Sequence, residues 1–145
     1  MKSNIVFADN IENSKRGTLR GLVIFPIFIA LTLIWLFFTK KIFYDKHIDT
    51  VSKDRLWISM GVTALLIVSA LGIHNPDTER KAIVYSALVG FVVYGIANVT
   101  LLAVTNKWGY IISLIDITWG VLSTSLLGYI LYIVVKKWPN IFAVV

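Results

Sequence analysis

Residues 21–38 read GLVIFPIFIALTLIWLFF, an apolar run of 18 residues without a charged side chain. An α-helix rises about 1.5 Å per residue and the hydrocarbon core of a bilayer is about 30 Å thick, so about 20 apolar residues are needed to cross it. The run therefore predicts a helix that spans a lipid bilayer. Pro26 lies one turn from its start, where a missing amide is tolerated.

Three further apolar runs follow, and polar loops separate them. The expected spans cover residues 21–38, 56–73, 82–104 and 109–135. The second span is the weakest, because glycine and hydroxyl side chains dilute its apolar character. A membrane β-barrel would need many segments of about 10 residues with alternating polarity. The sequence therefore predicts an all-α, integral membrane four-helix bundle with antiparallel, up-down-up-down topology.

Short polar segments flank the four-span domain, which is expected to cover residues 21–135. Residues 1–20 mix both signs of charge, and we expect disorder there or a short interfacial helix. Residues 136–145 form a short C-terminal tail. No small-residue cleavage site follows the first apolar run, so the first span is expected to stay in the mature protein. Thr78 precedes the third span and is placed to cap its N-terminus.

Composition excludes several classes of protein. Hydrophobic residues make up 57% of the chain and charged residues 15%, whereas a soluble domain has about 25% charged residues. The absence of cysteine excludes disulfides and thiolate metal sites. The net charge of +6 comes from basic residues at the ends of the apolar runs, where they meet phospholipid head groups, so we expect no nucleic-acid partner.

The first loop is rich in basic residues. An anionic lipid could bind there, although three Asp dilute the charge and an ordinary solvated loop is the favoured alternative. The basic residues of this loop are Lys40, Lys41, Lys46, Lys53 and Arg55. The two termini and the second loop carry eight Lys/Arg, against six in the first and third loops. This small excess predicts a multi-pass protein with both termini cytoplasmic.

Asp116 is the one charged residue within the four expected spans. It lies about 10 Å below the membrane face that carries the first and third loops. A carboxylate at that depth costs about 2.5 kcal/mol or more unless it is neutral, paired or wet, so we expect it to face the other helices. Polar residues of the other spans reach a similar depth or lie one turn away. The expected cluster comprises Asp116, Asn98, Tyr94, Thr32, Thr63 and Thr100.

Small residues recur at helical spacing on the last two spans. They are Gly90 on the third span and Gly120, Thr124 and Gly128 on the fourth. A small-xxx-small pattern lets two membrane helices approach closely. We therefore expect the third and fourth spans to pack tightly against each other.

Two interpretations of Asp116 remain open. In the first, a protonated Asp116 donates a hydrogen bond to Asn98 or Tyr94 and fixes the helix packing of a structural or assembly subunit. In the second, Asp116 takes up and releases protons or cations in a small oligomeric transporter or channel. Flux through proteoliposomes would separate these two interpretations.

An enzyme is the least favoured class. A lone acid without a neighbouring His, Cys or second carboxylate offers little acid–base chemistry, and the loops are too short to form a soluble catalytic domain. His47 and His74 fall on loops at opposite membrane faces, so a shared metal site is not expected. We therefore assign no catalytic residue, metal or cofactor.

Several segments resemble a known family. They are Trp35-Leu36, Phe43-Tyr44, Tyr94, Asn98-x-Thr100, Trp108 and Asp116-Ile117-Thr118-Trp119-Gly120. This combination is similar to the uncharacterised predicted-membrane-protein family called domain of unknown function 2177, which occurs in bacteria, algae and large DNA viruses. The resemblance covers residues from about 21 to 135, and the Asp-x-x-Trp-Gly segment is its most specific part. It implies a four-helix membrane fold and no established activity. Trp35 and Trp119 are also expected to be helix-packing residues.

The chain departs from that family in its acids. The family's third span carries Tyr-Asp-x-Thr-Asn, where this chain has Ala97, Asn98, Val99, Thr100 and Leu101. An acid of the family's first span corresponds to Thr32 here. Of these acids, Asp116 alone remains. If the family's role needs paired intramembrane carboxylates, we expect this member to have lost or changed that role.

Overall fold

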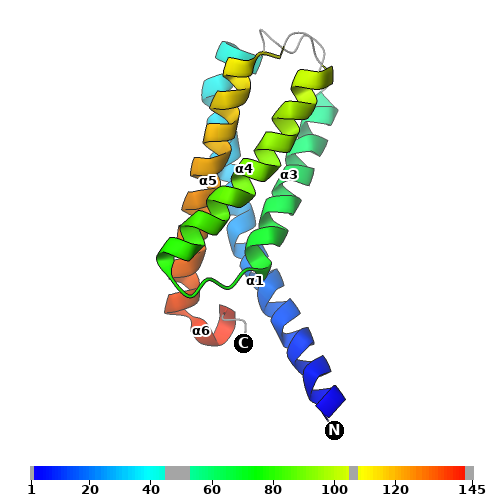
Figure 1. Ribbon diagram of the computed structural model, residues 1–145, viewed down its shortest axis with the longest axis vertical. Coiled ribbons are helices and arrows are strands. Elements are labelled where there is room, and N and C mark those ends of the chain that lie inside the picture. Colours follow the sequence, from blue (N-terminus) through cyan, green and yellow to red (C-terminus); the bar gives the residue numbers. More distant parts are fainter. Residues whose placement is uncertain (1, 45–52, 105–107, 143–145) are drawn as a thin grey trace.

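The computed structural model describes residues 2–44, 53–104 and 108–142, and the side chains of residues 12–42, 58–104 and 108–142. Its elements are α1 (Lys2–Thr39), the π-helix η1 (Lys40–Tyr44), α3 (Lys53–Ile73), α4 (Glu79–Val104), α5 (Tyr110–Lys137) and α6 (Pro139–Phe142). No strand occurs in these described ranges. The long helices lie side by side and alternate in direction (Figure 1). The predicted all-α helical bundle is therefore confirmed.

Among the residues that the structure describes, three helices are long and apolar enough to cross a membrane. The candidate segments are Glu12–Ile42, Glu79–Val104 and Tyr110–Lys137. The apolar part of α3, Ile58–Ile73, is shorter than these. It corresponds to the span that the sequence marks as weakest, since its glycine and hydroxyl residues reduce its apolar character.

Helix α1 begins earlier than the sequence analysis expected. It runs without a break from Lys2 to Thr39, across the boundary expected at residue 20, and its N-terminal part extends beyond the other helices (Figure 1). Two contacts support this extension. Arg16 pairs with Glu12 at 3.1 Å, one helical turn away, and Arg20 is fully buried by contacts described below. Residues 2–20 are therefore part of the same helix as the first apolar run.

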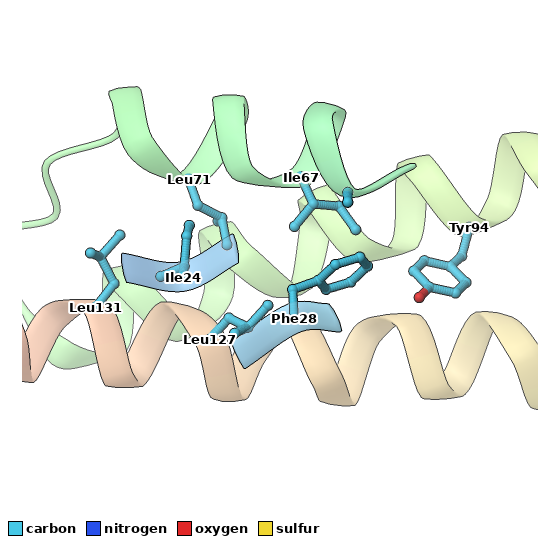
Figure 2. Close-up of a cluster of buried hydrophobic side chains, with 8 residues drawn as sticks. Ile24, Phe28, Ile67, Leu71, Tyr94, Leu127 and Leu131 are labelled. Carbon is cyan, nitrogen blue, oxygen red and sulfur yellow. The ribbon is translucent and has the colours of Figure 1, made fainter. Parts of the chain in front are cut away.

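The hydrophobic core lies between α1, α3, α4 and α5. It consists of Ile24, Phe28, Ala64, Ile67, Leu71, Tyr94, Leu127 and Leu131. Figure 2 shows Ile24 and Phe28 of α1 between the side chains of α3 and those of α5. Large apolar side chains also cover the outside of the bundle; Phe37 and Ile111 are 81% and 75% exposed. An apolar surface of this extent is typical of a helix bundle surrounded by lipid.

Helices α4 and α5 approach each other most closely. The buried residues of α4 recur every fourth position, and they are Ala82, Ser86, Gly90, Tyr94 and Asn98. They face the small residues of α5. A Cβ atom at Gly120 would collide with the Tyr94 ring, and one at Gly90 would collide with Thr124 and the Gly120 carbonyl. Glycine at these two positions is therefore required by the short distance between the two backbones.

The connection between α3 and α4 is a short polar turn. The backbone N–H of Lys81 donates to Thr78 Oγ1 at 3.3 Å, so Thr78 caps α4 as the sequence suggests. Lys81 also forms an exposed ion pair with Asp77 at 2.6 Å. This ion pair and the hydrogen bond between the side chains lower the pKa of the Asp77 carboxyl.

Candidate functional site

Asp116 lies near the start of α5 and connects three helices. Its Oδ2 atom accepts a hydrogen bond from Asn98 Nδ2 at 2.8 Å. Its Oδ1 atom accepts a hydrogen bond from Trp35 Nε1 at 3.3 Å. Because Trp35 belongs to α1 and Asn98 to α4, the carboxyl group of α5 links both of those helices.

Asn98 extends this network to a second tryptophan. Its side chain is fully buried, and its Oδ1 atom accepts a hydrogen bond from Trp108 Nε1 at 3.1 Å. An indole nitrogen can only donate, so the amide oxygen of Asn98 must face Trp108 and its NH₂ group must face Asp116. The same NH₂ group also donates to the Tyr94 carbonyl at 2.9 Å, within α4. Both ends of the amide are therefore used.

The hydrogen bonds of Asp116 can be compared with the first of the two interpretations, in which a protonated Asp116 donates to Asn98 or Tyr94. In the structure the amide and the Trp35 indole both donate to the carboxyl group, one to each oxygen. The carboxyl group of Asp116 is therefore the acceptor in both of these contacts.

Two stacked tryptophans form the wall beside Asp116. The rings of Trp35 and Trp119 lie 4.6 Å apart between centroids and within 5° of parallel. They border a groove of about 320 Å³ on the outside of α1 and α5. Stacking on Trp119 therefore fixes the position of Trp35, whose indole N–H donates to Asp116.

Trp119 Nε1 and Ser113 Oγ are buried polar atoms without a hydrogen-bond partner in the described part of the chain.

The three threonines of the expected cluster do not join the network. Thr32 donates to the Phe28 carbonyl at 2.9 Å, and Thr100, which is exposed, donates to the Ile96 carbonyl at 2.8 Å. Thr63 is half-buried, and its hydroxyl has no hydrogen-bond partner among the residues that the structure describes. A threonine hydroxyl in a helix is satisfied by the carbonyl four residues earlier, so a shared depth does not bring it to Asp116.

Tyr94 and the packing residues occupy the contact between α4 and α5. Tyr94 is buried, its ring lies against Gly120, and its side chain interacts with Ser123. It contributes its backbone carbonyl to the network. Thr124 is fully buried and donates to the Gly120 carbonyl at 2.7 Å. Gly128 is in close contact with Ser86 of α4.

Arg20 is a polar centre that the sequence analysis missed. Its Nε atom donates to the Phe142 carbonyl at 2.6 Å, Nη1 to the His74 carbonyl at 2.9 Å, and Nη2 to Asn75 Oδ1 at 2.7 Å. These acceptors belong to α6 and to the turn before α4. The position of Arg20, just before the first apolar run, was the available signal, but sequence alone does not show that the C-terminal tail returns to it.

His74 lies beside this arginine. Its ring stacks on Tyr85 with 3.7 Å between centroids, and its Nε2 atom is buried without a hydrogen-bond partner in the described chain. Burial and the nearby Arg20 charge lower the pKa of His74. His47, the other histidine, lies outside the described residues.

The basic residues considered for an anionic lipid are described only in part. Lys40 and Lys41 are exposed at the start of η1, whereas Lys46 and the side chains of Lys53 and Arg55 lie outside the described residues. Within the described ranges, no group of three His, Cys, Asp or Glu side chains could hold a metal ion.

Comparison with known proteins identifies the family. The model of a family described as predicted membrane proteins, DUF2177, matches residues 19–133, which include Arg20, Trp35, Asn98 and Asp116. No curated protein and no solved structure matches the chain. The match covers most of the sequence and extends over α1, α3, α4 and α5. The resemblance inferred from the sequence is thus confirmed, and the chain belongs to the DUF2177 family of predicted membrane proteins.

Proposed function

We propose that this chain is a multi-pass membrane protein without enzymatic activity that serves as a structural or assembly subunit. The observation that carries the proposal is the position of Asp116 between Trp35 of α1 and Asn98 of α4. A carboxylate in a membrane is costly when it is isolated. Here its oxygens are used to hold helices together.

Magnitudes support a packing role. Hydrogen bonds between membrane helices contribute about 0.6 kcal/mol each on average. The two bonds to Asp116 and the Trp108–Asn98 bond would together stabilise the bundle by about 2 kcal/mol on that scale. This contribution is a useful fraction of the marginal stability of a small domain.

We further propose that α3 makes the fourth crossing. With Lys53–Ile73 it has 21 residues and a length of about 30 Å. Ile67 and Leu71 pack into the core beside α1, so a neighbouring helix covers part of the surface of this weaker span. An even number of crossings places both termini on one side, and the distribution of Lys and Arg favours the cytoplasm.

The test compares the wild-type chain with Asp116→Asn. The full-length proteins are purified, and each is measured for thermal unfolding in detergent and for proton and cation flux in proteoliposomes. We expect Asp116→Asn to unfold at a lower temperature and neither protein to support flux. Asp77→Asn is the matched control, since Asp77 is an exposed acid outside the spans.

The alternative function gives a distinct result. If wild-type protein conducts protons or cations and Asp116→Asn does not, while Asp77→Asn conducts normally, the chain is a small transporter or channel and the structural proposal is wrong. An unchanged unfolding temperature in Asp116→Asn would also contradict the packing role.

A further inference from the structure

We propose that the groove between α1 and α3 binds one anionic glycerophospholipid. The groove has a volume of about 760 Å³ and lies on the outside of the bundle, at the end that carries Arg20 and the turn before α4. It is separate from the Asp116 network, since none of the residues of that network lines it.

Glycines form the floor of the groove. A Cβ atom at Gly72 would lie 2.8 Å from the Gly17 carbonyl oxygen, and one at Gly21 would lie 2.9 Å from a methyl group of Val68. The backbones of α1 and α3 are therefore in contact here. The missing side chains leave a hollow above this contact, and the exposed side chains of Leu22 and Leu65 border it.

The lining changes from polar to apolar along α1. Asn13, Ser14 and Thr18 line the end that precedes the first apolar run, and Leu22 and Phe25 line the part within that run. In a bilayer, the start of an apolar run marks the level of the head groups. The groove therefore leads from the head groups into the hydrocarbon, which matches a molecule with a polar head and an acyl chain.

Charge at the polar end favours an anionic head group. Lys15 is exposed, follows Ser14 and lies one helical turn before Thr18. Glu12, the nearby acid, pairs with Arg16 at 3.1 Å. Lys15 thus lies in the sequence between Ser14 and Thr18, which line the groove, and basic residues at this level attract anionic lipids.

The test uses the full-length protein in detergent with equal amounts of phosphatidylglycerol and phosphatidylcholine, and native mass spectrometry measures the lipid retained. We expect wild-type protein to retain one phosphatidylglycerol. Ser69→Trp, which fills the groove from α3, should lose it. Val62→Trp should retain it, because Val62 is exposed on the same helix outside the groove. Circular dichroism checks that the variants are helical.

A second pair of variants tests the head group without adding bulk. Lys15→Gln should reduce the preference for phosphatidylglycerol about fivefold, whereas Lys136→Gln, at the same end of the bundle, should not. The proposal is overturned if Ser69→Trp and Val62→Trp retain lipid equally, or if wild-type protein shows no preference between the lipids. A dimer that Ser69→Trp dissociates would identify a second copy as the occupant and would also overturn it.

Discussion

Asn98 occupies a position where both the oxygen and the nitrogen of its side-chain amide form hydrogen bonds. Its amide oxygen accepts from Trp108, and its amide nitrogen donates to Asp116 on the neighbouring helix. Leucine has a similar size but offers neither group, and aspartate could not donate to the Asp116 carboxylate. The residue therefore links Trp108 to the carboxyl group of Asp116.

Replacement of Asn98 by alanine should destabilise the protein by about 1–3 kcal/mol, because it leaves the buried Trp108 N–H and one oxygen of Asp116 without this partner. The measurement is thermal or denaturant unfolding of purified protein in detergent. Thr100→Ala is the control on the same helix, since Thr100 is exposed and bonds only to its own helix. Its change should stay within about 0.5 kcal/mol. Equal losses in both variants would contradict the network.

His74 should make stability depend on pH. Its pKa is lowered in the folded protein, chiefly by burial, so below about pH 6.5 the unfolded chain binds a proton that the folded chain does not. Stability therefore falls as the pH drops below that value. Asp77 does not contribute in this range, because its lowered pKa keeps it ionised.

The expected result is a lower unfolding temperature at pH 5.5 than at pH 7.5, with a smaller difference in His74→Gln. The remaining histidine, His47, is present in both proteins and cancels in the comparison. If the two proteins lose the same amount of stability, His74 is not the group responsible.

At the level of helices, the contact between α4 and α5 depends on small residues in register. Gly120 lies directly against the Tyr94 ring, whereas a Cβ atom at Gly95 of α4 would meet nothing within 4 Å. A side chain is therefore excluded at Gly120 and tolerated at Gly95, so the two glycines give a matched pair of substitutions.

Gly120→Ala should separate α4 from α5 and cost about 1–3 kcal/mol, because the added methyl group overlaps a ring that is held in the core. Gly95→Ala should leave stability unchanged or raise it by up to about 1 kcal/mol, since alanine favours a helix more than glycine does. Unfolding of both variants in the same detergent checks the prediction. A neutral Gly120→Ala would show that the helices are further apart than the structure indicates.

The helices themselves were largely predictable, and the side-chain contacts were predictable only in part. Long apolar runs predicted the segments that became α4 and α5, because helix length and bilayer thickness impose the same requirement. The start of α1 was not predictable from composition, because the helix continues through a segment of mixed charge that carries no long apolar run.

The contacts of the candidate site were likewise predictable only in part. Helical rise places Asp116 and Asn98 at a similar depth, and the structure brings these two residues together. Depth does not specify the rotation of each helix about its axis or the reach of each side chain. The contribution of α1 is therefore Trp35, whose long side chain reaches the carboxylate, and not Thr32, whose hydroxyl bonds to its own helix.

Across the whole molecule, a different set of polar contacts holds the helices together at each end of the bundle. The Asp116 network lies toward the start of α5, and α6 lies at the opposite end beside the N-terminal part of α1 (Figure 1). Between them the helices are held by apolar side chains such as Phe28 and Leu127 (Figure 2). A mutation that removes the contacts of Arg20 should therefore leave the Asp116 network intact.

Arg20 provides the test of that separation. Its guanidinium group donates to three oxygens, one of them the carbonyl of Phe142 in α6. Lysine keeps the charge but cannot make the same fork of hydrogen bonds, so Arg20→Lys should release α6 and the turn before α4. We expect hydrogen exchange at the Ile141 and Phe142 amides to become faster, while exchange around Asp116 stays unchanged.

Arg16→Lys is the control for Arg20→Lys, because Arg16 makes an ion pair within its own helix one turn away. This variant should leave exchange in α6 unchanged. Faster exchange at both ends of the bundle in Arg20→Lys would mean that the whole bundle loosens together. In that case Arg20 stabilises the whole bundle, and the Asp116 network does not stabilise its end of the bundle independently of Arg20.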